Sequence, residues 1–107
     1  MKVNPHHLLF FQLLKSAKPS ERKVLLAGAE HAIIKIIAET IHNLLLGNIP
    51  VDDATTRRLQ AYKQTLYILA NRTVTLHQKR GLLQQRADGS FFFLLLPILS
   101  TTFEHPT

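Results

Sequence analysis

The segment from Glu30 to Leu46 carries the helical pattern that most constrains what this chain can fold into. Its apolar side chains fall on one broad face of the expected helix: Ile33, Ile34, Ile36, Ile37, Ala38, Ile41, Leu44 and Leu45. The polar stripe that remains is narrow, and it comprises His31, Lys35, Glu39 and His42. We therefore expect this helix to lie at the centre of the core with neighbouring elements around it.

Helices are also expected on the amino-terminal side of this segment. Residues 1–17 read as a short apolar helix with Pro5 near its first turn, where a missing amide costs little. Pro19 suits the first position of a second helix, which is expected to end near Gly28 with its buried side formed by Val24, Leu25 and Leu26. The apolar stretch of residues 1–17 is short and is followed by lysines, so it is not expected to be a secretory signal.

On the carboxyl side, local capping chemistry divides the chain into further helices. Gly47 is expected to close the central helix as a left-handed cap. Asp52 is expected to be the N-cap of a helix that runs to about Ala70, because its carboxylate accepts hydrogen bonds from free amides. Thr75 and Gln78 fit a capping box at the start of a helix over residues 76–85.

These elements predict an all-α fold, a small bundle of four to five short helices with an apolar C-terminal tail. At 107 residues the chain is expected to be one domain. Residues 1–17 form its apolar N-terminal helix, residues 18–86 its core with a basic helical hairpin, and residues 87–107 its apolar tail.

Positive charge is concentrated in the middle of the chain. The net charge is +6 with neutral histidine, and residues 51–86 hold seven of the 13 basic side chains with two acidic ones. We predict that two helices of this region pack as a hairpin that directs its basic side chains outward, toward nucleic-acid phosphates or an acidic partner. The candidate contact residues are Arg57, Arg58, Lys63, Arg72, Lys79, Arg80 and Arg86. The alternative is that these side chains only provide solubility.

Both ends of the chain are apolar and suggest a second kind of contact. The run from Phe91 to Leu99 contains one non-aliphatic, non-aromatic residue, Pro97, and it is too short to span a bilayer as a helix. Three alternatives stay open for it: closure of the core, contact with another chain, or insertion into a membrane interface. The candidate contacts for self-association or a capsid protein are Leu9, Phe10, Phe11, Phe91, Phe92, Phe93 and Leu95.

Most catalytic chemistry has no basis in this sequence. The chain has no Cys, which excludes disulfides, thiol catalysis and cysteine-based zinc sites. Its four glycines are too far apart for a phosphate-binding loop. His6, His7 and His105 are one candidate metal set, but they are better explained as ordinary exposed side chains. His31 and His42 share one helical face, but Lys35 between them would repel a cation, so a solvated stripe explains them better. We expect neither an enzyme nor a cofactor nor a metal site.

The order of residues after position 47 resembles a known group of proteins. The shared features are Gly47-Asn48-Ile49-Pro50, a capped helix with Leu59, Tyr62-Lys63 and Leu66, then Leu69-Ala70, Val74-Thr75-Leu76, Lys79-Arg80, Leu82-Leu83 and Gln85, a glycine-containing turn and a tail rich in Phe, Leu and Pro. The chain thus resembles small basic proteins of Maverick/Polinton-type elements and of adintoviruses and adomaviruses. This resemblance covers roughly residues 15–99.

The resemblance implies a non-enzymatic structural protein of a virus-like or transposon-encoded particle, such as a minor capsid protein, inside the host-cell nucleus or the virion. Lys63, Lys79 and Arg80 lie on the shared pattern. The chain departs from the group at Ala87-Asp88-Gly89-Ser90, where a shorter Gly-Gly turn is more usual, and in being less basic. No binding residues of the group carry over.

Overall fold

Helices make up all the regular structure in the part of the chain that the structure describes. A computed structural model describes residues 4–87 and 89–104, with side chains up to residue 100. The elements are α1 (Pro5–Ser16), α2 (Pro19–Ala27), α3 (His31–Leu45), α4 (Asp53–Leu59), the 3₁₀ turn η1 (Gln60–Tyr62), α5 (Lys63–Ala70), α6 (Leu76–Gln85) and α7 (Ser90–Glu104). The predicted all-α class is confirmed.

The number of helices differs from the prediction. Because α4, η1 and α5 follow one another without a break, the described residues form six helical segments rather than four or five. The additional segment is α7, which the sequence indicated only as an apolar tail. Its first ten residues are almost uniformly apolar, so they lack the polar side that would have marked a helix, and Pro97 lies inside it.

The predicted caps at three helix ends are confirmed. Gly47 has a φ of 80°, and the Asn48 amide donates to the Asn43 carbonyl at 2.9 Å, which closes α3 as a Schellman motif. The Asp52 side chain accepts a hydrogen bond from the Thr55 amide at the start of α4. Thr75 and Gln78 form the expected reciprocal box at the start of α6. These caps fix where the chain turns around α3 and α4.

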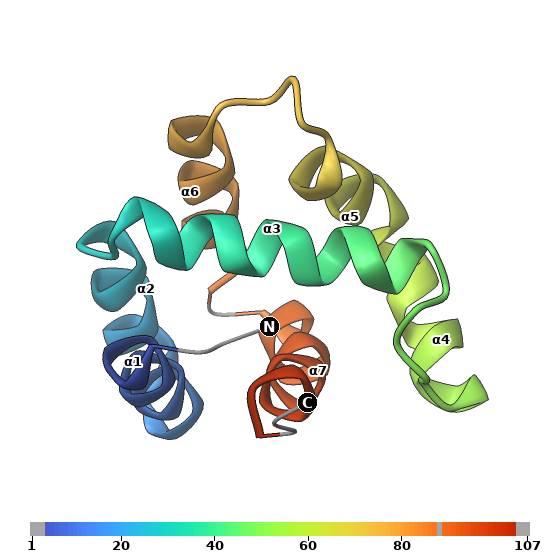
Figure 1. Cartoon of the computed structure of the whole chain (residues 1–107), viewed down its shortest axis with the longest axis horizontal. Coiled ribbons are helices and arrows are strands. Elements are labelled where there is room, and N and C mark those ends of the chain that lie inside the picture. The colour runs from blue at the N-terminus through green and yellow to red at the C-terminus, as the bar shows by residue number, and fades with distance from the viewer. Residues whose placement is uncertain (1–3, 88, 105–107) are drawn as a thin grey trace.

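Helix α3 runs across the whole molecule, with α1 and α2 at one end and α4 and α5 at the other (Figure 1). Helix α6 packs on α2, α3 and α5, and α7 contacts α1, α3 and α4. The largest fully buried side chains come from six of these helices: Leu14, Leu26, Ile34, Ile37, Ile41, Leu69, Leu83, Phe91, Phe92, Leu95 and Leu99. Core closure is therefore what most of the Phe91–Leu99 run does.

Helix α2 differs from its expected orientation. Leu26 is fully buried and Leu25 is half-buried, but Val24 is 71% exposed, so its placement on the buried side was wrong. Arg22 lies one helical turn before Leu26 and takes the inward position instead. The reason is tertiary: the guanidinium of Arg22 joins α1, α2 and the start of α7, as described below.

Candidate binding surfaces around helix α4

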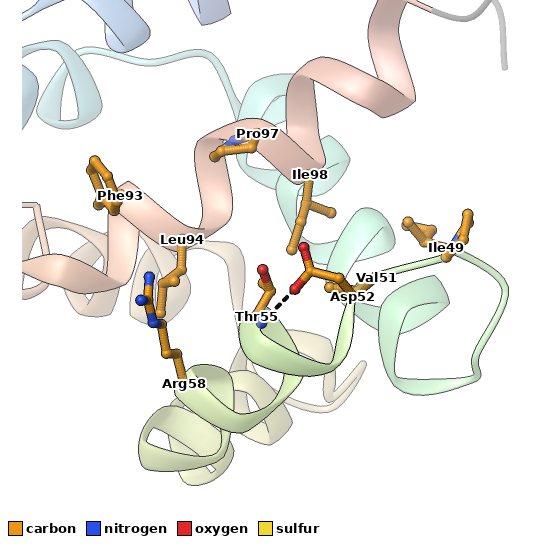
Figure 2. A pocket seen from close by; sticks show the side chains of 10 residues that line it. Ile49, Val51, Asp52, Thr55, Arg58, Phe93, Leu94, Pro97 and Ile98 are labelled. Atoms are coloured by element: carbon orange, nitrogen blue, oxygen red, sulfur yellow. Dashed lines mark hydrogen bonds between the residues drawn. The ribbon is translucent and has the colours of Figure 1, made fainter.

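Two arginine side chains of α4 are exposed, in positions that a phosphate or carboxylate can approach. The Asp52 carboxylate accepts from the Thr55 amide at 2.7 Å, and the Thr56 hydroxyl donates to the Asp52 carbonyl at 3.0 Å, which fixes the first turn. Leu59 is buried, so the helical period turns Arg57 outward and Arg58 toward the flank that faces α7. Figure 2 shows Arg58 beside Leu94 of α7.

The charge of Arg58 also acts on Asp52. The hydrogen bond from the Thr55 amide is the main reason that the pKa of the Asp52 carboxyl lies below its usual range, and the positive Arg58 side chain lowers it further. Asp52 therefore stays ionised as the cap of α4. Its negative charge at the positive end of the helix dipole also stabilises α4 electrostatically.

Arg86 lies close to the same flank of the α4–η1 segment. Its guanidinium carbon is 5.8 Å from the centre of the Tyr62 ring. Tyr62 in turn shares a hydrogen bond between its hydroxyl and that of Ser90, and its ring centre is 5.3 Å from that of Phe91. Tyr62 follows Arg58 by four residues, so Arg86 lies near the ring of a residue about one turn after Arg58. We call Arg57, Arg58 and Arg86 the α4 arginine surface.

Lys79 and Arg80 do not face outward as the sequence predicted, and that prediction was wrong. Lys79 is 5% exposed. Burial lowers the pKa of its ammonium group, and the Glu39 carboxylate opposes this shift without reversing it. No described side chain has a buried nitrogen or oxygen atom without a partner, so the lysine stem is buried while its ammonium group reaches solvent. Arg80 donates to the Leu26 carbonyl at 2.8 Å and closes the end of α2.

The remaining two members of the predicted basic set lie elsewhere. Arg72 follows α5 and approaches Glu39 of α3, with 3.8 Å between the guanidinium and carboxylate. Lys63 is exposed at the start of α5, where its ammonium nitrogen is 5.9 Å from the centre of the Tyr67 ring. The seven basic residues thus occupy several environments instead of one hairpin surface. Of these, Arg57 and Arg58 are adjacent on α4, and Arg86 lies near the ring of Tyr62.

Arg22 has a structural role that the sequence analysis missed. Its guanidinium nitrogens donate to the carbonyl oxygens of Leu14 at 3.3 Å, Ala17 at 3.4 Å and Ala87 at 3.0 Å. Its guanidinium carbon also lies 5.6 Å from the centre of the Phe92 ring. The signal was its spacing of four residues from Leu26, which places a cation on the apolar face of α2.

Two hollows open on either side of α4, and Ile49 and Val51 line both of them. The smaller, of about 270 Å³, lies between the 49–52 segment, α4 and α7, and Figure 2 shows its lining side chains, including Phe93 and Asp52. The larger, of about 560 Å³, lies between the end of α3, the turn at Gly47 and the α4–α5 segment. We call the larger one the α3–α5 groove.

The candidate contacts at the two apolar ends divide into buried and exposed groups. Phe11, Phe91, Phe92 and Leu95 are buried and Phe10 is half-buried, so the folded molecule does not present most of them to a partner. Leu9 is 56% exposed and Phe93 is 73% exposed. Only these two of the predicted contact residues have most of their side-chain surface available.

The described residues contain no group of side chains arranged to hold a metal ion. The histidine, aspartate and glutamate side chains there include no cluster of three that would hold a metal ion. His7 approaches Glu30 at 3.5 Å, and His105 lies outside the described residues. No helix in the same part of the chain combines the length and apolar character needed to cross a membrane.

Comparison with known proteins adds no relative to this picture. No family model matches the chain, and neither a curated protein nor a solved structure shows detectable similarity to it.

Proposed function

We propose that the protein is a non-enzymatic component of a virus-like or transposon-encoded particle that contacts nucleic-acid phosphates through the α4 arginine surface. The observation that carries this proposal is that Arg57, Arg58 and Arg86 are exposed and none forms an ion pair with a described side chain. Arginine suits phosphate contact because its planar guanidinium donates two parallel hydrogen bonds.

The three arginines of this surface outnumber the two carboxylates at the start of α4, so an excess of positive charge remains. Asp52 and Asp53 lie at the start of α4, where the carboxylate of Asp52 is engaged by the Thr55 amide. The excess of positive charge continues over the whole molecule, with a net charge of +6. Such a surface binds nucleic acid without reading its sequence, and its affinity falls steeply with salt because counterions are released.

The particle context comes from the resemblance described for roughly residues 15–99, which is strongest over residues 47–99. That resemblance concerns proteins of virus-like elements. In such a particle, the proposed role of a small basic protein is to join the genome to other particle components. It supports a location in the host-cell nucleus or the virion. Membrane disruption is a less favoured role, because most of the apolar run it would need is packed in the core.

Duplex DNA binding over a salt series tests the proposal. Arg57→Gln combined with Arg58→Gln should reduce affinity and lower the slope of log K against log salt by roughly 0.9 for each phosphate that is no longer neutralised. Lys15→Gln combined with Lys23→Gln removes the same charge from exposed positions on α1 and α2 and should leave the slope nearly unchanged. Absence of binding at low salt, or equal effects of the two double variants, would contradict the proposal.

Assembly through apolar side chains is the second candidate function. The observation in its favour is the 73% exposure of Phe93, which lines the smaller hollow. If this side chain mediates self-association, Phe93→Ser should remove a concentration-dependent oligomer seen by light scattering. Val24→Ser, an equally exposed apolar change on α2, should have no such effect. A wild-type chain that stays monomeric at high concentration rejects self-association.

A further inference from the structure

The α3–α5 groove combines apolar side chains with polar groups in its lining. Leu44, Ile49 and Leu66 are among its apolar side chains, whereas Gln60 and Lys63 are among its polar ones, and the exposed lining is about equally polar and apolar. Tyr67 is 54% exposed, and the adjoining Leu46 is 61% exposed. Large apolar side chains that remain this accessible next to a hollow are typical of contact sites.

One cation determines the electrostatic character of the groove. Lys63 is the only charged residue among those that line it, and its ammonium nitrogen lies near the ring of Tyr67 at the open side. No carboxylate of the described residues lines the groove, and the molecule as a whole is positively charged. A partner that places a carboxylate opposite Lys63 and apolar side chains against the walls would be complementary in both respects.

The walls also indicate the conformation of such a partner. They come from helices and the segment over residues 47–51, and the described residues include no strand, so the walls offer no sheet edge to an extended peptide. The helical walls favour recognition through side chains, as when an amphipathic helix inserts apolar residues at positions i, i+3 or i+4, and i+7. At Gly47 the rim is open, since a Cβ built there would meet no atom within 4 Å.

We propose that the α3–α5 groove binds an acidic amphipathic helix of a partner protein, with Lys63 paired to a carboxylate on its flank. A second copy of this chain fits less well, because it would bring another net charge of +6 against Lys63. Nucleic acid also fits less well, because the groove offers only one cation and one aromatic ring among its lining residues. The proposal is independent of duplex binding by the α4 arginine surface.

Two designed helical peptides with the same leucine face test the groove. One carries glutamates along the flank of that face and the other carries lysines at the same positions. Fluorescence anisotropy at low salt should show that the glutamate peptide binds at least tenfold more tightly than the lysine peptide. Tyr67→Ser should weaken binding of the glutamate peptide about tenfold, which corresponds to about 1.4 kcal/mol. Val24→Ser is the matched apolar control and should have no effect.

A charge reversal separates local pairing from general attraction. Lys63→Glu should invert the preference, so that the lysine peptide binds more tightly than the glutamate peptide. Lys15→Glu makes the same change in net charge on α1 and should retain the original preference. Failure of the glutamate peptide to bind at millimolar concentration overturns the proposal, and so do equal effects of the two charge reversals.

The same variants show whether this proposal fails separately from the proposed function. Tyr67→Ser should leave the affinity for duplex DNA unchanged, and the Arg57→Gln, Arg58→Gln double variant should bind the glutamate peptide with no more than a twofold loss. Circular dichroism melting curves confirm that each variant is folded. Loss of peptide binding in the arginine double variant would contradict a separate groove.

Discussion

At the scale of single residues, the basic side chains of this protein divide into two groups: some form hydrogen bonds inside the fold, and others are exposed. Arg22 and Arg80 donate to carbonyl groups at helix ends, whereas Arg57 and Arg58 are exposed. The residue type alone does not predict which group a side chain belongs to, because a long basic side chain is stable both against carbonyl groups inside the fold and in solvent. What separates them is which carbonyl oxygens the packed helices bring within reach.

Arg22→Lys should destabilise the protein by about 1–3 kcal/mol, because an ammonium group cannot serve three separated carbonyl oxygens and the Phe92 ring in the same way as a guanidinium. Urea denaturation measures this change. Lys23→Gln, at the exposed neighbouring position, should change the free energy of unfolding by less than about 0.5 kcal/mol. Equal stability of Arg22→Lys and the wild type would show that the hydrogen bonds of the Arg22 guanidinium contribute little to the free energy of unfolding.

Lys79 offers a test of the cost of burying a charged side chain. Because burial lowers its pKa, the unfolded chain binds this proton more tightly, so stability rises with pH through the window between the lowered pKa and about 10.4. Lys79→Met should be at least as stable as the wild type at neutral pH and should lack this increase. Urea denaturation of both proteins from pH 7 to about 10.5 measures this rise in the free energy of unfolding. The same dependence on pH in both proteins would contradict its attribution to Lys79.

At the scale of elements, helix ends were predictable from local chemistry, while the outward sides of short helices were not. Gly47, Asp52 and Thr75 each act on groups within a few residues, so their roles follow from the nearby sequence. The side that α6 presents depends on α2 and α3, which are distant in the chain. That dependence is why Lys79 and Arg80 were wrongly placed outward.

The cap of α4 makes a prediction in acid. The pKa of Asp52 is lowered mainly by the Thr55 amide, so its stabilising effect is complete above about pH 4 and is lost as pH falls through that lowered pKa. Asp52→Asn should lower the melting temperature at pH 7 and reduce the loss of stability between about pH 4 and pH 2. Asp53→Asn is the matched control, with a smaller effect expected because Asp53 is not the N-cap of α4. Melting curves followed by circular dichroism over this pH range measure these effects. Identical melting temperatures of the two variants at each pH would contradict the role of Asp52 as the stabilising cap.

Helix α7 shows where the same local reasoning ends. The aromatic and aliphatic residues at its start carry no alternation that separates a buried from an exposed side. The surrounding helices determine that Phe91 and Phe92 are buried and that Phe93 is exposed. The sequence therefore identified this segment as apolar and left its partner open, and the packing of α1, α3 and α4 against it supplies the answer.

At the scale of the whole molecule, α3 and α7 form a core on which α4 and α5 expose two chemically different surfaces. The α4 arginine surface lies toward the start of α7, and the α3–α5 groove lies on the other flank of α4. The sequence predicted the basic character of residues 51–86 and missed the groove, because its walls combine residues 44–51 with residues 56–67. We propose that the first surface contacts phosphates and the second a partner helix.

The separation of these two surfaces is tested most directly by mapping chemical shifts of backbone amides in the ¹⁵N-labelled protein. Addition of duplex DNA should shift the amides of residues 57, 58 and 86 with little change at 45–47 and 67, and the glutamate peptide should produce the reverse pattern. Shifts at the same residues with both ligands, or shifts concentrated on α1 and α2, would contradict two separate surfaces on either side of α4.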